Sequence, residues 1–598
     1  MALKDRDVVM LCVGVMVAIF GIGGLLTLSK LFEVLVIGRL PLLPGSETYE
    51  GWKKISFPIY QKFYYFNVTN PEAVLKRGET PKLVEVGPYT WRGEWVKENV
   101  EWNPNGTLQY REKKTYWFDR EHSVGDQDDR IVTINTPLVA ASQRVKNASP
   151  VMKLAIAIVV NALNESLFIR RSVRQLTYEG YPDVLAELSH IMNKNIPVKK
   201  GRFAYMSGKN DTDEGLFNVF SGSENIDRFN QIDRWNGRQK LPWWNPDTPC
   251  ADIKGTNGEL IHPIRNEDSH IYFFNPNFCK PWKLSRDSQP VSSYGLPLQR
   301  FVAGPEVLYN SSKNPDHACF ETSRYKLPSG GMDISRCQFG IPLVLSYPHF
   351  YAADPAYLEA VDGLSPDRAK HQFSIDIEPR MGIALGLAAR AQINIKLTRV
   401  DLLSAFRNIP EIVLPIFWQE MDISQTPEFA NHLHGLIDQP YLYATLAYAS
   451  MIACGGLVAL GTLVHIFLVY LRNLNQAPDL SRDKEAKCQA DLGGPVIVTS
   501  RHIPLIRKMR SLFWSRKTWK RTLKKEPHSK TLDGDMAPSA PSAVLNNSPK
   551  NNNSIQSTSS PSASPVAAAD YRGSEWIKNI FIPDQSMSTK VNCNVTLK

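Results

Sequence analysis

Cysteine is the residue type in this sequence with the clearest capacity for chemistry. Of the eight cysteines, four lie between residues 29 and 440: Cys250, Cys279, Cys319 and Cys337. In an oxidising compartment, four thiols predict two disulfides, for which three connectivities are possible. Zinc coordination is the alternative, but the sequence has no C-x-x-C pair and no cluster of histidines. Disulfides are therefore the favoured prediction.

Two histidines, His349 and His371, are the other candidates for chemistry. Neither has a serine, aspartate or cysteine that sequence spacing ties to it. The sequence also contains no HExxH, GxSxG or phosphate-binding motif. Because catalytic groups can be assembled from distant residues, this result only disfavours an enzyme. We predict a protein that is not an enzyme and that binds no cofactor, no metal ion and no nucleic acid.

These residues belong to a chain that is predicted to cross a membrane twice. Tyr441–Leu471 contains no Asp, Glu, Lys or Arg and exceeds the roughly 20 apolar residues that a spanning helix needs. A buried helix of a soluble domain rarely stays apolar on every face over such a length. Val8–Leu28 is a second apolar segment. A signal peptide would have a shorter apolar region and a small-residue cleavage site, so we interpret this segment as an uncleaved signal anchor.

Charge predicts the side of the membrane on which each segment lies. Asn408–Pro440 contains no Lys or Arg. Four basic residues soon follow the second span: Arg472, Arg482, Lys484 and Lys487. Basic residues beside a span mark the cytosolic face, so residues 1–7 and 472–598 are predicted to be cytosolic. Residues 29–440 then form an ectodomain at the plasma membrane or, alternatively, in the lumen of endosomes or lysosomes.

The net charge of +10 is accounted for by the excess of basic residues in the tail, residues 472–598. A basic cytosolic tail suits the anionic inner leaflet of the membrane. Ile503–Lys525 is predicted to be an amphipathic helix on that surface, and a solvated basic segment is the alternative. Residues 538–570 are rich in Ser, Pro, Asn and Ala and are predicted to be disordered. Tyr571–Pro583 is a candidate for a short adaptor-binding motif.

N-x-S/T sequons predict glycosylation of the ectodomain. Six of them begin at Asn67, Asn105, Asn147, Asn164, Asn210 and Asn310. Three further sequons lie in the tail, at Asn546, Asn552 and Asn594. Because glycosylation takes place in the lumen, the tail sequons are predicted to stay bare.

Several long motifs follow one another between the two spans. They are FYYFNVTNPEAVLKRGETPKLVEVGPY (63–89), NGTLQYREKKTYWF (105–118), GLFNVFSG (215–222), IDRWNG (232–237) and MDISRCQFGIPLVLSYP (332–348). In this order they resemble the class B scavenger receptor family, which includes the fatty acid translocase, the high-density-lipoprotein receptor, a lysosomal integral membrane protein and insect sensory neuron membrane proteins. The resemblance covers about residues 26–471 and leaves out the tail.

The resemblance implies an α+β membrane protein with two transmembrane helices. The ectodomain would have an antiparallel β-barrel core, a helical bundle at the membrane-distal apex (about 150–195) and a hydrophobic tunnel toward the bilayer. The resemblance also implies the pairs Cys250–Cys319 and Cys279–Cys337. Many members have a third pair, whose first cysteine would fall at Glu321. This chain lacks it, so we expect the loop Glu321–Gly331 to be looser.

The resemblance places ligand binding at the apex. In the fatty acid translocase a lysine-bearing stretch there attracts anionic ligands, but the nearest equivalents here, residues 161–164, include no basic residue. This difference argues against polyanion binding of that type. The remaining basic candidates are Lys153, Arg170, Arg171 and Arg174, for each of which a solvated face is the alternative. The apolar run Ile156–Val160 is predicted to be core rather than a docking patch.

Taken together, these features predict a scavenger-type receptor. It would bind lipids, lipoproteins or lipid-rich particles and transfer hydrophobic cargo to or across the membrane, with endocytosis as a further role. An apolar path is required because each exposed methylene costs about 0.8 kcal/mol in water. Two alternatives remain: a lysosomal or endosomal sorting receptor for a protein partner, and a phagocytic or adhesion receptor that signals through its tail.

Overall fold

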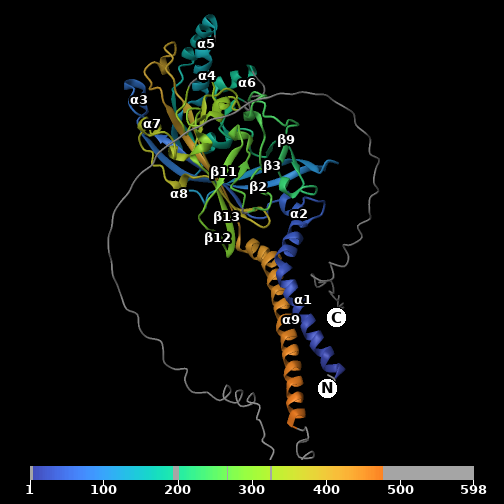
Figure 1. Cartoon of the computed structure of the whole chain (residues 1–598). Helices are drawn as coiled ribbons and strands as arrows, with labels where there is room; N and C mark the ends of the chain where they lie inside the picture. Colours follow the sequence, from blue (N-terminus) through green and yellow to red (C-terminus); the bar gives the residue numbers. More distant parts are fainter. Residues whose placement is uncertain (1–3, 148, 193–200, 266, 323–325, 476–598) are drawn as a thin grey trace, which may run out of the picture. The chain divides into compact units, whose positions relative to one another are not determined.

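The computed structural model describes residues 4–147, 149–192, 201–265, 267–322 and 326–475 (Figure 1). The predictions for the tail, including its helix at Ile503–Lys525 and its three sequons, lie outside the described residues. Two long helices, α1 (Asp5–Ile37) and α9 (Pro427–Asn475), contain the two apolar segments. Each is long and apolar enough to cross a membrane, and they flank a large antiparallel sheet.

Both helices continue beyond the apolar segments that the sequence marks. α1 has 33 residues and α9 has 49, because backbone hydrogen bonds can extend a helix past the residues that suit a bilayer. The first turns of α9 pack on the ectodomain, where Ala430 and Leu433 share a buried cluster with Leu296 and Leu298. Hydropathy thus predicts the membrane-embedded part, whereas contacts with the ectodomain extend the helix.

Small residues bring α1 and α9 into close contact. A Cβ atom at Gly14 would lie 2.8 Å from the backbone nitrogen of Ala459. A Cβ atom at Gly455 would lie 2.6 Å from the backbone nitrogen of Ala18. Such distances leave no room for a side chain, so glycine at these two positions permits the approach of the backbones.

The ectodomain is built on one 14-stranded sheet whose pairings are antiparallel. Eleven strands follow one another across it: β10 (His270–Phe273), β11 (Trp282–Arg286), β13 (Leu296–Ala303), β16 (Ser374–Glu378), β17 (Ile383–Lys396), β18 (Val413–Ser424), β1 (Ile59–Val68), β2 (Leu83–Trp102), β3 (Thr107–Asp119), β8 (Thr212–Phe220) and β9 (Ile232–Trp235). β12 (Val291–Ser293) pairs with β13, and β14 (Met332–Asp333) pairs with β15 (Leu343–Ser346), which pairs with β17.

A short segment links the two edge strands of this sheet. The backbone nitrogen of Ile232, in β9, donates to the carbonyl of Gly255 at 2.9 Å. The next residue, Thr256, donates to Tyr272 in β10 at 3.1 Å and accepts from Phe274 at 2.8 Å. Hydrogen bonds through residues 255–256 therefore join β9 to β10 and close the sheet into a barrel, which leaves fewer exposed edge groups.

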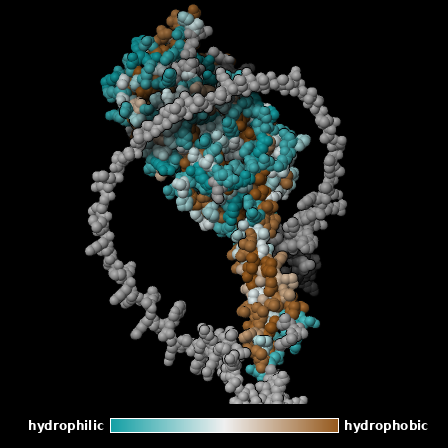
Figure 2. All heavy atoms as spheres, in the orientation of Figure 1, coloured by the Kyte–Doolittle hydropathy of each residue, from teal (hydrophilic) through white to brown (hydrophobic). Residues whose placement is uncertain are grey.

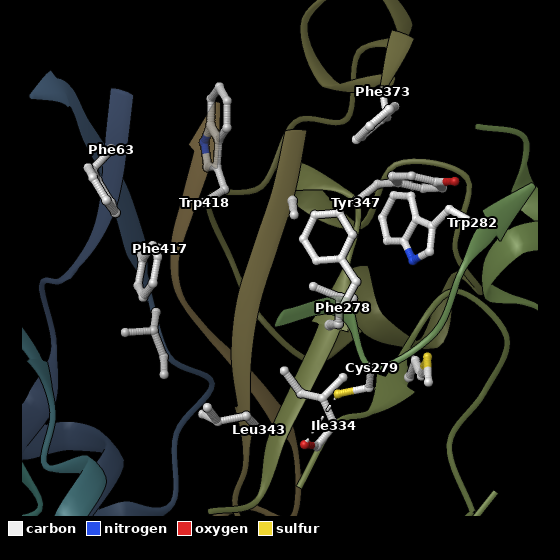
Figure 3. Close-up of a cluster of buried hydrophobic side chains, with 14 of the residues drawn as sticks. Phe63, Phe278, Cys279, Trp282, Ile334, Leu343, Tyr347, Phe373, Phe417 and Trp418 are labelled. Atoms are coloured by element: carbon white, nitrogen blue, oxygen red, sulfur yellow. Dashed lines mark hydrogen bonds between the residues drawn. The ribbon is translucent and has the colours of Figure 1, made fainter. Parts of the chain in front are cut away.

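Aromatic side chains from the barrel wall fill part of its interior (Figure 3). Phe63 of β1 and Phe417 of β18 have ring centroids 5.8 Å apart. Trp282 of β11 packs with its centroid 5.7 Å from that of Tyr347 and 5.4 Å from that of Phe373. Strand alternation supplies these rings, because successive side chains point to opposite faces of a sheet.

Three helices form the end of the ectodomain opposite α1 and α9 (Figure 1): α4 (Thr136–Asn147), α5 (Pro150–Leu163) and α6 (Val184–Met192). α4 contacts both α5 and α6. Two small sheets, β4 (Arg130–Ile134) with β5 (Phe168–Ser172) and β6 (Tyr181–Pro182) with β7 (Arg202–Phe203), accompany them. The other helices are short: α2 (Glu47–Lys53), α3 (Pro71–Arg77), α7 (Ala356–Glu359) and α8 (Arg368–His371).

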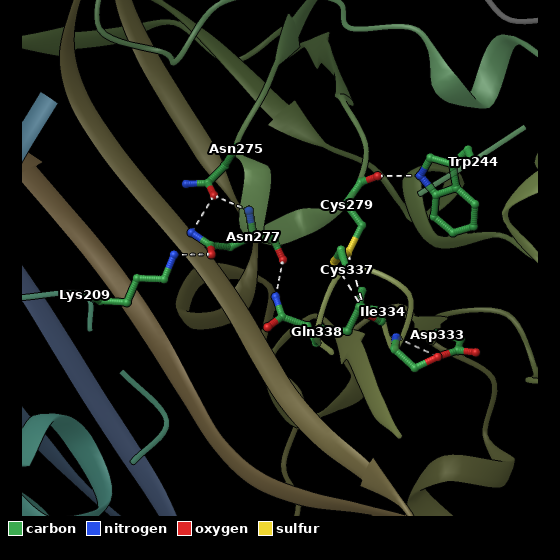
Figure 4. Close-up of a disulfide and its surroundings, with 10 residues drawn as sticks. Lys209, Trp244, Asn275, Asn277, Cys279, Asp333, Ile334, Cys337 and Gln338 are labelled. Carbon is green, nitrogen blue, oxygen red and sulfur yellow. Dashed lines mark hydrogen bonds between the residues drawn. A yellow bond between two sulfur atoms is a disulfide. The ribbon is translucent and has the colours of Figure 1, made fainter. Parts of the chain in front are cut away.

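The disulfides are Cys250–Cys319 and Cys279–Cys337, the pairs that the resemblance implies. Figure 4 shows the second, where the carbonyl of Cys279 accepts a 2.7 Å hydrogen bond from the indole of Trp244. Each bridge closes a long loop, which on a chain-entropy account stabilises the fold by about 2–4 kcal/mol. Glu321, the position of the missing third pair, instead accepts a 2.6 Å hydrogen bond from the backbone of Ser311.

Candidate functional site

Exposed apolar side chains gather at the tip of the apex, where the surrounding surface is mostly hydrophilic (Figure 2). On α5, Ala157 and Val160 are buried, and the opposite side of the helix is exposed. α6 adds further exposed side chains to the same end of the ectodomain. The exposed residues, here called the apex surface, are Val151, Leu154, Ile158, Val159, Val184, Leu188 and Ile191, with exposed fractions between 40% and 83%.

The expectation that Ile156–Val160 would be core holds for only part of this run. Ile158 is 60% exposed and Val159 is 48% exposed, although Ala157 and Val160 are buried. Because α5 is apolar apart from Lys153 and Asn161, its sequence contains no continuous polar face to mark the surface. Packing on α4 decides which side is covered. A contiguous exposed apolar patch typically marks a site for a partner or a lipid surface.

The four basic candidates do not form one cationic cluster of free side chains. Lys153 lies on α5, whereas Arg170 and Arg171 lie on β5. The guanidinium of Arg171 stacks on the ring of Tyr181 at 4.7 Å. Arg174 is paired with Asp128 and lies 3.9 Å from Glu179. Nearby carboxylates thus neutralise Arg174, which weakens its capacity to attract an anion.

The predicted glycosylation sites differ in exposure. Asn105 and Asn164 are exposed, and Asn164 has a left-handed backbone at the end of α5. Asn67, Asn210 and Asn310 are half-buried; the side-chain nitrogen of Asn210 donates to the carbonyl of Tyr116, and that of Asn310 to Leu327. A glycosylated amide keeps one N–H, so each hydrogen bond is compatible with a glycan. The side chain of Asn147 lies outside the described part of the chain.

Some apolar side chains on the inward face of the barrel wall are only half-buried. The register pairs Ala389 with Met421 and Ile393 with Phe417 across β17 and β18. Leu387 and Phe417, buried in the core, mark the inward face of these strands. Because side chains alternate along a strand, Ala389, Ile393 and Met421 share that face. These three are only half-buried, unlike Leu387 and Phe417 on the same face, which are buried.

A buried ionic cluster occupies another part of the interior, and sequence reasoning missed it. The ammonium of Lys97 on β2 is fully buried and lies 2.8 Å from Glu112 on β3 and 2.6 Å from Glu259. Lys114 connects Glu112 to Glu214, at 3.4 and 2.9 Å. The alternation of side chains along β2 could have indicated this cluster. It places Lys97 on the same face of the strand as Trp91 and Trp95, which are both buried.

Burial and charge separate the acidities of the two carboxyl groups around Lys97. Burial, and then the neighbouring Glu112 carboxylate, raise the pKa of Glu259 to about 7. Burial alone would also raise the pKa of Glu112, but Lys97 and Lys114 outweigh it and lower that pKa to about 2. Near neutral pH one carboxyl therefore stays ionised while the other titrates.

His349 and His371, the two histidines singled out by sequence, lie together in a buried stack with ring centroids 4.5 Å apart. The backbone nitrogens of Ser365 and Asp367 donate to their Nδ1 atoms, and His349 Nε2 bonds Glu85. Burial, and then His349, lower the pKa of His371 to about 4. Within the described residues, no group of three or more His, Cys, Asp or Glu could hold a metal ion.

A polar groove of about 480 Å³ lies on the outer face of β13, β16 and β17, beside α8. Arg300 forms two hydrogen bonds with Asp376, at 2.6 and 2.7 Å. Arg390 pairs with Glu420 at 2.7 Å. These ion pairs leave little free charge, and the polar lining is unsuited to apolar cargo.

The fold and these sites define a class: a membrane protein in which two terminal helices flank a disulfide-bonded barrel with an apolar apex. The model of the CD36 family matches residues 12–466. Scavenger receptor class B member 1 of Bos taurus is 33% identical over 411 residues, 68% of this chain and 79% of the relative. Lysosome membrane protein 2 of Homo sapiens is 34% identical over 415 residues, 69% of this chain and 84% of the relative. The chain belongs to the CD36 family.

Proposed function

We propose that this chain is a class B scavenger-type receptor that captures lipids, lipoproteins or lipid-rich particles at its apex surface. It then passes hydrophobic cargo through the barrel toward the membrane. Its relatives include proteins named scavenger receptor class B member 1. The observation that carries the transfer step is the half-buried apolar group Ala389, Ile393 and Met421 on the inward face of β17 and β18.

The proposal includes the finer predictions made from sequence. The spans are taken as residues 8–28 and 441–471, and residues 29–440 as the glycosylated ectodomain. The tail lies in the cytosol against the anionic leaflet. The protein acts as a receptor rather than as an enzyme. Lys153, Arg170 and Arg171 have at most a secondary role at the apex, since the exposed apolar side chains dominate that surface.

The transfer step is tested by enlarging a side chain on the inward face of β17. Ala389→Phe places a ring on the inward face of β17, so transfer of a fluorescent lipid ester into cells should fall several-fold at equal surface expression. Ala388→Phe is the matched control, because Ala388 is the neighbouring residue and lines the outer groove. Unchanged transfer by properly expressed Ala389→Phe would reject the conduit, and lipid mass spectrometry of the purified protein would identify its cargo.

A second candidate function is a lysosomal or endosomal sorting receptor for a protein partner. It is favoured by relatives named lysosome membrane protein 2 and by the apex surface, which suits an apolar face of a protein as well as a lipid surface. Steady-state location and a stoichiometric protein in pull-downs would support this alternative. If Ile158→Asp removes that protein while lipid transfer stays intact, sorting is the function of the apex.

A further inference from the structure

A hairpin at the membrane-proximal end of the ectodomain exposes an aromatic residue that the core does not use. β12 and β13 pair from Val291 with Leu298 to Ser293 with Leu296. Tyr294 and Gly295 form the turn, with φ of 48° and 82°. Tyr294 is 54% exposed. The ring of Tyr294 is therefore held at the tip of the hairpin, exposed, rather than packed in the core.

The hairpin is fixed to the beginning of α9. Leu296 and Leu298 pack in a buried cluster with Ala430 and Leu433. Close to the tip, His434 Nε2 lies 3.0 Å from the carbonyl oxygen of Tyr294. Figure 1 shows β12 reaching down beside the upper end of α9. The position of the tip along α9 is therefore defined by contacts rather than by the conformation of a free loop.

This position brings the tip close to the bilayer. His434 precedes Tyr441, the start of the apolar segment, by seven residues, which is at most about 10 Å along a helix. The head-group layer extends roughly 5–8 Å beyond the hydrocarbon core. A side chain that projects from the tip thus needs to bridge only a few ångströms. Between His434 and Tyr441 along α9, Asp438 pairs with Arg380 of the β16–β17 turn at 2.7 Å.

We propose that the β12–β13 hairpin is a membrane contact, in which Tyr294 inserts into the phospholipid head-group layer of the bilayer crossed by α9. Tyrosine suits this layer because its ring is apolar and its hydroxyl is polar. The partner is the lipid surface itself, and the surface is continuous with the membrane-embedded part of α9. The contact adds a third support beside the two spans and limits the tilt of the ectodomain relative to the membrane.

The test is photocrosslinking of the full-length protein in phospholipid nanodiscs. Tyr294 is replaced by p-benzoylphenylalanine, and lipid adducts are measured by mass spectrometry after irradiation. Phe339 is the matched control, because it is 44% exposed and also has a left-handed backbone, with φ of 53°. Phe339 precedes β15, which pairs with the end of β17 near Ile395, far from Ile383 at the membrane-proximal end.

The expected result is a lipid adduct at position 294 in several times the yield at position 339. Equal yields at the two positions, or a crosslink from position 294 to a second copy of the chain, would overturn the proposal. Should the variant at 294 fail to fold, the exposed Ser292 of the same hairpin provides a second position for the photoreactive residue. A lipid adduct there supports the contact, and its absence in a folded variant rejects it.

Discussion

Protonation of Glu259 makes the folding stability of the barrel depend on pH. Its pKa of about 7 lies above the ordinary value of 4.5, so the folded chain binds this proton more tightly than the unfolded chain does. The stabilisation from Glu259 is therefore fully present below about pH 4.5 and is lost as pH rises through 7. His371 acts in the opposite direction, because its lowered pKa makes acidification from 6.5 toward 4 destabilising.

Glu259→Gln should remove the contribution of Glu259 to the pH dependence. Relative to the unchanged protein, the variant should lose the gain in unfolding free energy between pH 7.5 and 5, on the order of 1–3 kcal/mol. Thermal or denaturant unfolding at pH 7.5 and pH 5 measures this difference in unfolding free energy. Glu94→Gln is the control, since Glu94 belongs to an exposed pair with Lys54. If both variants follow the pH dependence of the unchanged protein, the buried carboxyl does not titrate in this range.

At the scale of elements, the contact of α1 with α9 depends on particular glycines. Gly455 faces the backbone of α1, whereas a Cβ atom at the adjacent Gly456 would meet nothing within 4 Å. Sequence hydropathy does not distinguish these two residues, since both lie in the same apolar run. The two glycines differ in their contacts because the rotation of α9 about its axis turns Gly455, and not Gly456, toward α1.

Gly455→Leu should separate the two helices, because overpacking of this kind costs about 1–3 kcal/mol. The contact is reported by a short bifunctional crosslinker between cysteines introduced in place of Phe20 and Tyr448, whose rings are 6.5 Å apart. The two disulfides are kept, and Cys12, Cys454, Cys488 and Cys593 are replaced by serine. We expect the crosslinking yield to fall with Gly455→Leu and to persist with Gly456→Leu. Equal yields in both backgrounds would show that this pair of glycines does not set the helix contact.

For the whole molecule, the proposed function assigns capture to the apex surface and transfer to the inward face of β17 and β18. Ile158→Asp places a charge in the apex surface, where Ile158 is 60% exposed. It should reduce binding of lipoprotein particles several-fold and reduce transfer in proportion, because a buried unpaired charge is costly at an apolar contact. Ala389→Phe, by contrast, should leave particle binding intact and reduce only transfer.

Particle binding and lipid transfer are measured separately on cells matched for surface expression. Val124→Asp is the control for the charge, because Val124 is similarly exposed, at 59%, but precedes β4 and lies outside the apex helices. A loss of binding equal to that of Ile158→Asp would mean that the added negative charge, rather than its position on α5, is responsible.

Features that depend on local composition could be predicted from the sequence alone. The absence of charge in Tyr441–Leu471 predicted the second span, and the ordered motifs between the spans carried the resemblance to the family, which in turn implied the antiparallel ectodomain. The relevant information is present within each segment, because spanning a bilayer and forming a half-buried strand are local requirements. The resemblance supplied the cysteine pairing, which the spacing of the cysteines left open.

Which residues of similar type are core, surface or site follows from how the elements pack together. Ile158 and Val160 have equivalent chemistry, yet packing against α4 and the barrel buries the second and exposes the first. Lys97 has the composition of a surface residue, but closure of the barrel places it between Glu112 and Glu259. The pairing of Ala389 with Met421 and the contact of Tyr294 with α9 likewise depend on segments far apart in the chain. Such features depend on which elements come together in space, and no single segment of the sequence specifies that arrangement.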